Sequence, residues 1–146
     1  MATFIQPFHF TTYIVGQDTD GLSKAPTAGL GGLVKLDKPD TIGLPELKAA
    51  YERSDLPILV GLQTDDPAIV PTEASQIVDG DTARIMGRIT SSRMSPNLGR
   101  SVCLAQVDPS LAAAGTSVTV LPADGRRVTA TVQEHHAHLE IGRAHA

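Results

Sequence analysis

Short apolar runs alternate with turn residues through the second half of the chain, and this pattern predicts a β-rich domain. The runs recur at intervals typical of small barrels and sandwiches, with glycine, proline, serine or aspartate between them. Their β-branched residues suit a pleated, half-buried surface. The predicted strands are Ile58–Leu62, Ala83–Thr90, Ser101–Val107, Ser117–Leu121 and Arg127–Gln133.

The period of two within these runs predicts which face is buried. In Val128–Gln133, valine and alanine alternate with threonine and glutamine, so one face packs and the other meets water. In 84–89, the same period predicts a buried face and a second face that meets water or a partner. The buried set is Ile85, Gly87 and Ile89, and the other set is Arg84, Met86 and Arg88.

The first third of the chain has a different texture. Leu44–Arg53 predicts a helix, because its apolar residues recur at three and four positions and proline stands in its first turn. Phe8–Val15 predicts a strand, and Leu30–Leu36 a strand that carries a glycine bulge. The pattern changes from helix to strands at Ser54–Pro57, which predicts one unit over residues 1–54 and another over 55–146.

Composition narrows the function classes. A formal net charge of -4 gives no basic footprint for nucleic acid or an anionic membrane surface. The chain has neither a signal-peptide pattern at its start nor an apolar run long enough to span a bilayer. The single cysteine, Cys103, excludes an internal disulfide and fits a reducing compartment. We therefore expect a cytoplasmic protein.

Two groups of motifs resemble one family over roughly residues 11–134. The strings GQDTDG at 16–21, AGL at 28–30 and KPDTIG at 38–43 resemble the middle of heterotetrameric sarcosine oxidase α subunits. The string GRITSSRMSPNLGR at 87–100 resembles a signature of the glycine cleavage T-protein C-terminal barrel. Its Ser95-Pro96 pair and Gly99 suit a tight turn between two strands. The resemblance implies a mainly β (α+β) fold, a T-protein-like barrel preceded by a strand-plus-helix remnant of the folate-binding domain.

The chain departs from the family where folate is bound. Phe8–Tyr13 stands where family members place an arginine and a glutamate that help to hold the pterin. A neutral segment supplies neither the charged donor nor the carboxylate acceptor. Thr41 and Gly32 replace family aromatics, and His135–His138 replaces a proline-aromatic segment. Because the chain begins at Met1, we also expect the N-terminal half of the family fold, with its catalytic carboxylate, to be absent.

Four arginines gather around the barrel signature and predict a partner interface. Guanidinium groups pair with carboxylates across an interface, with the tail of a polyglutamylated folate as the alternative. The residues are Arg84, Arg88, Arg93 and Arg100.

The remaining clusters have simpler explanations. His136 and His138 share a face of an extended chain but lack a third ligand, so we expect no metal site. Asp18 and Asp20 fit turn chemistry, and Cys103 a small buried hydrophobe. Gly29–Gly32 lacks the lysine and hydroxyl residue of a phosphate-binding loop. We therefore predict no catalytic residue on this chain and identify no cofactor-binding residue.

Three functions remain open. The first is a small non-catalytic subunit of a flavin-dependent amine oxidase or dehydrogenase. Its flavoprotein partners would carry FAD or FMN and iron–sulfur groups, and tetrahydrofolate would bind at a site shared with a chain that carries the folate-binding half. The second is a truncated folate-dependent aminomethyltransferase or demethylase with its own one-carbon transfer activity. The third is a free-standing barrel that binds an unrelated small molecule.

Overall fold

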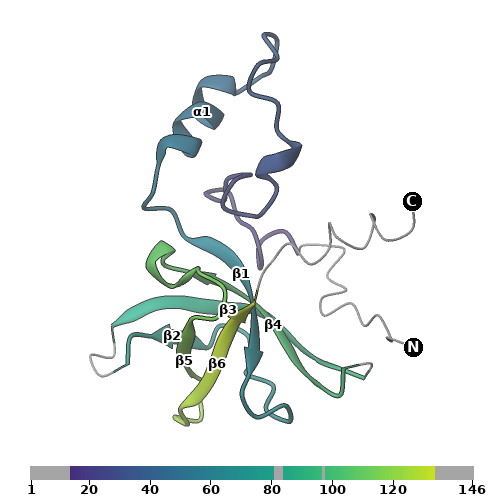
Figure 1. Ribbon diagram of the computed structural model, residues 1–146, viewed down its shortest axis with the longest axis vertical. Helices are drawn as coiled ribbons and strands as arrows, with labels where there is room; N and C mark the ends of the chain where they lie inside the picture. The colour runs from purple at the N-terminus through teal and green to yellow at the C-terminus, as the bar shows by residue number, and fades with distance from the viewer. Residues whose placement is uncertain (1–13, 81–83, 97, 134–146) are drawn as a thin grey trace.

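The computed structural model describes residues 14–80, 84–96 and 98–133, and its main body is a closed six-stranded barrel (Figure 1). All strand pairs are antiparallel, in the order β1-β4-β3-β2-β5-β6. The strands are β1 (Ile58–Thr64), β2 (Gln76–Val78), β3 (Ile85–Ser95), β4 (Arg100–Val107), β5 (Ser117–Leu121) and β6 (Val128–Gln133). The mainly β fold class predicted from the sequence is confirmed.

The barrel interior is filled by small and branched apolar side chains from alternate strand positions. In β6 the valines and Ala130 are buried while Thr129 is exposed, as the alternation predicts. Since branched side chains pack well on a pleated surface, the core needs no aromatic residue. Its buried members are Val60, Leu62, Ile77, Ile89, Cys103, Ala105, Val107, Val118, Val120, Val128, Ala130 and Val132.

The five predicted strands are present, and one further strand was missed. β2 has three residues, too short to give a periodic signal. β3 runs five residues beyond its predicted end and turns through Ser95 to Gly99, whose φ of 61° requires glycine-like freedom. The Gly99 amide donates to the Ser95 carbonyl over 2.9 Å. The turn predicted from the Ser-Pro pair and Gly99 is therefore correct.

One prediction about the buried face of β3 is wrong. Ile85 was expected inside with Gly87 and Ile89, yet it is 59% exposed. The register between β2 and β3 shifts, because Ile77 pairs with Gly87 but Val78 pairs with Ile85. A bulge adds one residue to a strand and so reverses the facing of everything beyond it. Ile85 therefore lies outside the barrel.

The segment before β1, residues 14–57, is called the arm. Its helix α1 (Leu44–Glu52) agrees with the predicted helix, with Pro45 in the first turn. The predicted strand over Leu30–Leu36 is wrong, because a 3-10 helix, η1 (Gly31–Leu33), occupies it. The Leu33 amide donates to the Leu30 carbonyl and the Tyr51 hydroxyl to the Gly31 carbonyl, at 3.0 and 2.6 Å. Backbone groups that would pair with a neighbouring strand are thus bonded within the 3-10 turn or to a side chain of α1.

The predicted strand over Phe8–Val15 lies outside the described residues except for its last two. Of these, Val15 makes an isolated bridge to Thr19. The predicted boundary at 54/55 falls between the end of α1 and the start of β1.

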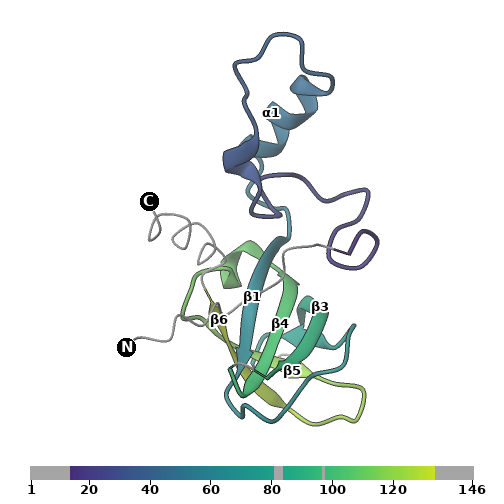
Figure 2. The same cartoon turned by 90° about the vertical axis from the view of Figure 1, so that its right-hand side faces the viewer.

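The arm rises from one end of the barrel, and α1 and the loop before it lie at its far end (Figure 2). A second 3-10 turn, η2 (Pro109–Leu111), follows β4 on the same end.

Candidate functional site

The outer face of β1, β3 and β4 is covered by the start of the arm. Leu104 is 2% exposed and Leu59 3%, although their strand neighbours Cys103, Ala105 and Val60 belong to the interior. Successive side chains of a strand point to opposite faces, so both can be buried only if another segment covers the outer face of the barrel. The Leu59 amide donates to the Thr27 carbonyl over 2.8 Å, which ties the arm to the first barrel strand.

Asp18 fixes this cover in place. Its side chain is 1% exposed, and both carboxylate oxygens are occupied by neutral donors. The Ser91 hydroxyl donates to Oδ1 over 2.6 Å, and the Ile14 amide donates to Oδ2 over 3.0 Å. A buried carboxylate must have such partners, because leaving it bare costs a large desolvation free energy.

Two glutamines complete the contact, and the four residues are called the anchor: Gln17, Asp18, Ser91 and Gln106. The Gln17 side-chain amide donates to the Thr90 carbonyl over 2.7 Å, and the Gln106 side-chain amide donates to the Asp18 backbone carbonyl over 3.1 Å. The anchor joins the GQDTDG string of the arm to the TSS string of the barrel. Asp18 therefore has a structural role, as the turn interpretation of the sequence had it, but it bonds Ser91 across 73 residues as well as the nearby Ile14 amide.

Asp20 lies next to the anchor and forms the predicted turn. Its carboxylate accepts from the amides of Leu22 and Ser23 over 2.9 Å each. The Leu22 amide, the Ser23 side chain and, more weakly, the Arg88 charge hold the pKa of Asp20 below its ordinary value. The Arg88 Nη2 atom lies 3.8 Å from Asp20 Oδ2, at the outer limit of an ion pair.

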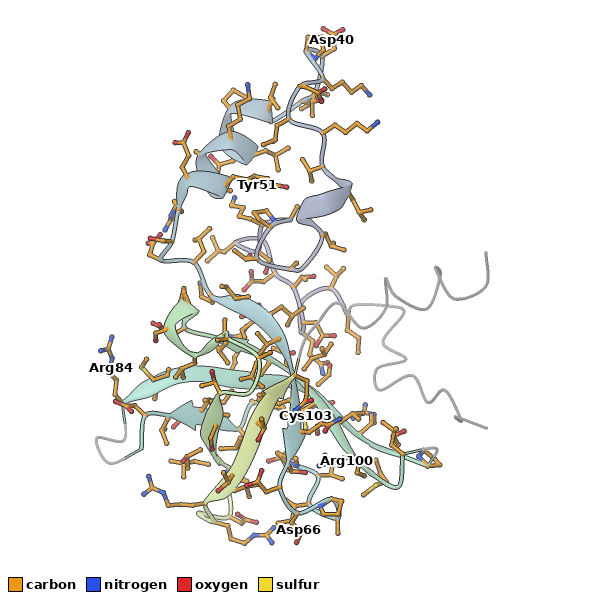
Figure 3. The ribbon with its side chains drawn as sticks, viewed as in Figure 1. Asp40, Tyr51, Asp66, Arg84, Arg100 and Cys103 are labelled. Atoms are coloured by element: carbon orange, nitrogen blue, oxygen red, sulfur yellow. The ribbon has the colours of Figure 1, made fainter. Side chains whose placement is uncertain are left out.

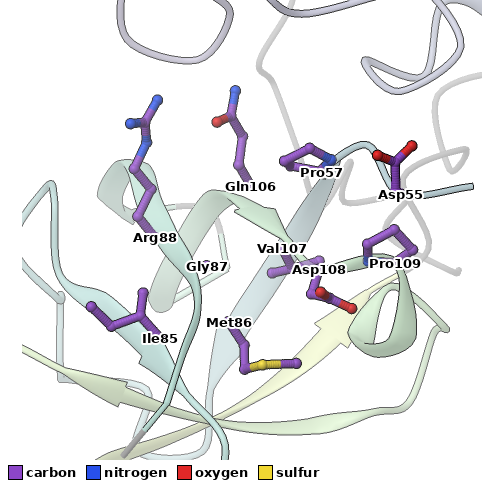
Figure 4. A pocket seen from close by; sticks show the side chains of 10 residues that line it. All are labelled: Asp55, Pro57, Ile85, Met86, Gly87, Arg88, Gln106, Val107, Asp108 and Pro109. Atoms are coloured by element: carbon purple, nitrogen blue, oxygen red, sulfur yellow. The ribbon is translucent and has the colours of Figure 1, made fainter. Parts of the chain in front are cut away.

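A notch of about 310 Å³ opens where the arm enters the barrel (Figure 4). Arg88 and Gln106 stand on one side of it, Asp55 and Pro57 on another, and Ile85 lies at its rim. The notch is lined by Asp55, Pro57, Ile85, Met86, Gly87, Arg88, Gln106, Val107, Asp108 and Pro109.

The four arginines predicted as an interface do not gather at one place. Arg84 and Arg100 lie at opposite sides of the barrel in Figure 3. Arg93 donates to Glu73 over 2.9 Å, and Arg100 donates to the Thr64 carbonyl over 2.8 Å while its buried Nε has no partner. Arg88 alone of the four lines the notch. The partner interface at all four positions stays a prediction.

The other candidate residues give no reactive site in the described part of the chain. Cys103 is fully buried, and burial raises the pKa of its thiol, with the Ser101 hydroxyl acting in the opposite direction. A thiol of this kind is inert. His136 and His138 lie outside the described residues, as do Phe8–Tyr13 and His135. Within 14–80, 84–96 and 98–133, no three metal-ligating side chains converge.

Comparison with known proteins identifies the family of this barrel. The family model of the glycine cleavage T-protein C-terminal barrel domain matches residues 58–137, which is more than half of the chain. The chain belongs to this T-protein barrel family. The resemblance of the string at 87–100 to the T-protein barrel is thereby confirmed, and the chain carries an aminomethyltransferase-like C-terminal domain. The resemblance of the strings at 16–43 to sarcosine oxidase α subunits stays a prediction.

Relatives of the T-protein barrel extend the likeness into the arm. An aminomethyltransferase of Saccharopolyspora erythraea is 42% identical over 94 residues, which is 64% of this chain and 25% of that protein. One from Synechococcus sp. is 36% identical over 109 residues, or 74% of this chain and 29% of that protein. The chain therefore spans about a quarter of the length of these relatives.

A solved T-protein shares the fold. The structure of glycine cleavage system aminomethyltransferase T from Bartonella henselae superposes with a TM-score of 0.77 at 17% identity. The match covers 86% of this chain and 35% of that one. Since the described barrel strands and loops alone are a smaller share of the chain, the matched region must include part of the arm.

Sequence reasoning missed Ser91, Gln17 and Gln106 as anchor residues, and Ile85 as a surface residue. The signal for Ser91 was a run of three hydroxyl residues, Thr90 to Ser92, inside a strand. Gln106 stands at an outward position of β4 between two buried apolar residues. No pattern in the sequence pairs either residue with Asp18.

Proposed function

We propose that this T-protein barrel chain is a non-catalytic subunit of a flavin-dependent amine oxidase or dehydrogenase, where it completes or caps a folate-type module and holds subunits together. The observation that carries the proposal is the anchor. It fixes the arm to the barrel with buried hydrogen bonds, while most of the arm is left with little apolar packing of its own. Such a segment suits an element that is completed by another surface.

The carboxylates of the described residues favour a structural role over proton transfer. Asp18 is the buried acid among them, and both of its oxygens are already occupied by donors. Asp55 receives two bonds from Arg53, at 2.9 and 2.8 Å. Burial separates Asp18 from solvent and Asp55 is engaged by Arg53, so the contacts of both groups favour a structural role over that of a general base.

Tetrahydrofolate, in this proposal, binds at a site shared with a chain that carries the folate-binding half. Near the junction of arm and barrel, Lys24 pairs with Glu46 over 2.9 Å and Arg53 pairs with Asp55. These charges are paired within the chain, so in this proposal the partner chain would supply the donor and the acceptor that hold the pterin ring. The described residues would therefore form a wall of such a site. FAD or FMN and iron–sulfur groups belong, on the same proposal, to the partner flavoprotein subunits.

The name shared by the relatives supports the competing function, an aminomethyltransferase with one-carbon transfer activity of its own. Gentle isolation of the chain from its native cells separates the two. Co-elution with flavin absorbance at fixed stoichiometry through two chromatographic steps is the expected result. A monomer that binds tetrahydrofolate and transfers one-carbon units without any flavoprotein would overturn the proposal.

No membrane contact is part of this proposal. Among the residues that the structure describes, none of the helices combines the length and hydropathy needed to cross a bilayer. A cytoplasmic location remains a proposal.

A further inference from the structure

The far half of the arm, residues 31–52, is called the outer arm, and it has no complete apolar core. Leu33 is 79% exposed and Ile42 99%, and α1 fully buries only Ala50. Leu44 and Leu47 of the same helix are half-buried. A short helix with a half-buried apolar stripe is stable in water when a second layer of structure covers that stripe.

The barrel does not supply this second layer. The outer arm points away from the strands in both views of the molecule (Figure 1, Figure 2). Among the described residues, none in 31–52 makes a hydrogen bond or an ion pair to a barrel strand. The contacts of the outer arm stay within the arm, such as the hydrogen bond of Tyr51 to Gly31 and the ion pair of Lys24 with Glu46. The anchor therefore holds the arm at its base and leaves the outer arm open to another surface.

The similarity to T-proteins includes part of the arm, although the arm lacks a core of its own. The match to the solved T-protein covers 86% of this chain, whereas the barrel model begins at residue 58. The matched region is 35% of the solved chain. In that protein the shared part of the arm therefore belongs to a larger chain, whose remaining part is a source of the layer that the barrel does not provide.

The chemistry of the outer arm fits a protein surface as the occupant. Large apolar side chains that are exposed to this degree mark contacts with other apolar surfaces. The loop between Leu33 and Ile42 carries charges of both signs, with Lys35 and Lys38 next to Asp37 and Asp40. Such a mixture creates no field of one sign that would favour nucleic acid or an anionic membrane.

We propose that the outer arm is the docking surface for a folate-binding region of the T-protein type that is carried by a separate chain. Leu33 and Ile42 enter the apolar surface of that partner, and the half-buried stripe of α1 is covered by it. This inference rests on the proposed function, because it names the surface through which the shared folate-type module is completed.

Exposed apolar residues of the barrel provide matched controls for the test. Leu33→Asp and Ile42→Asp alter the outer arm, whereas Met94→Asp and Ile85→Asp introduce the same charge at exposed apolar positions of β3. Each full-length variant competes with wild-type chain for the partner in the native complex, and the partner is identified by peptide sequencing. We expect each outer-arm variant to bind at least about tenfold more weakly, and each control within about twofold of wild type.

Hydrogen exchange gives a second readout, because it compares the wild-type chain free and in the complex. Amides of residues 31–52 should become protected on binding, while those of β1, β4 and β6 should change little. Circular dichroism of each free variant shows that the barrel has formed. Unchanged binding by the outer-arm variants, or equal loss with the barrel controls, would overturn the location.

The identity of the partner separates this inference from the proposed function. A wild-type chain that enters a flavin-containing complex without any T-protein-type chain would overturn the inference and leave the function standing. A chain that enters no complex would remove both. Concentration-dependent dimers of the free chain that Ile42→Asp abolishes would identify a second copy as the occupant and overturn the proposed partner.

Discussion

Different interactions stabilise the barrel and the arm. Of the buried apolar residues in the described chain, the arm contributes only Ala28 and Ala50, and the barrel contributes all the others. Large apolar side chains show the reverse distribution, since Leu33 is 79% and Ile42 99% exposed in the arm. Because burial of apolar area is the dominant favourable term in folding, the barrel stabilises itself and the arm does not.

The arm depends instead on hydrogen bonds to the barrel. A nine-residue helix is marginal in water without packing, and α1 buries one alanine. The anchor and the hydrogen bond between Leu59 and Thr27 therefore position the part of the arm that lies against the barrel. The far end of the arm is positioned by local contacts, such as the hydrogen bond from the Tyr51 hydroxyl to the Gly31 carbonyl. The difference shows that one part of the described chain has its own apolar core, whereas the other part is positioned mainly by hydrogen bonds.

The largest effect should follow from a change inside the barrel wall. In Gly87→Ala, the new Cβ would fall on the carbonyl oxygen of Gln106, well inside van der Waals contact, and 3.0 Å from the Val107 Cα atom. Backbone must move to relieve this, so we expect a loss of about 3 kcal/mol in the free energy of unfolding. Urea denaturation followed by circular dichroism measures it.

Gly32→Ala is the matched change in the arm, where an added Cβ meets nothing within 4 Å. Its effect should stay within about 0.5 kcal/mol. Equal effects of the two substitutions would contradict the assignment of stability to the barrel.

The next largest effect concerns the anchor. Ser91→Ala leaves Asp18 Oδ1 buried without its donor, which should cost about 1–3 kcal/mol. The loss should first appear as faster proteolysis within residues 20–50, because the anchor fixes the arm. The control is Ser110→Ala, which removes a bond of the same 2.6 Å length to Asp108, but at an exposed site. If cleavage of the arm were equally fast in both variants, the anchor would not be what fixes it.

A smaller effect of opposite sign is expected at Ala74. This residue has a φ of 65°, a conformation that suits glycine, and it is held there because its amide donates to the Ile89 carbonyl over 3.0 Å. Ala74→Gly should therefore raise the free energy of unfolding by up to about 1 kcal/mol. Ala123→Gly, in an exposed turn without positive φ, should be neutral or slightly destabilising. A thermal melt that ranked Ala123→Gly above Ala74→Gly would show that Ala74 is not strained.

The sequence predicted the barrel well because its strands carry a local signal. The alternation in Val128–Gln133 and the turn at Ser95–Gly99 depend on residues that are close in sequence, and both are correct. Ile85 was placed wrongly because the bulge depends on register with β2, a three-residue strand that has no pattern of its own. Leu30–Leu36 was placed wrongly because its apolar residues were taken as a sign of burial in a sheet.

The candidate site was less predictable for a physical reason. Asp18 was identified as a turn residue, but its partners Ser91 and Gln106 are brought to it only by the closure of the barrel. The arginines were grouped by their proximity in sequence, whereas Arg84 and Arg100 lie at opposite sides of the barrel (Figure 3). Hydrogen-bond partners that are 73 and 88 residues apart leave no periodic trace in a single sequence.

The smallest expected effect is the acid response of the arm. The hydrogen bond and charge of Lys24 hold the pKa of Glu46 below its ordinary value, and the Leu22 amide does the same for Asp20. A carboxyl whose pKa is lower in the folded state adds stability above its unfolded pKa, and this contribution is lost as the pH falls through the folded pKa. Both groups are exposed, so the loss is modest and is screened by salt. Amide exchange, corrected for intrinsic rates, should therefore rise in residues 20–50 below about pH 4 while β1, β4 and β6 stay protected. Glu46→Gln should remove part of this response. Exchange that rose first in the barrel strands would reverse the order of stability between the two regions.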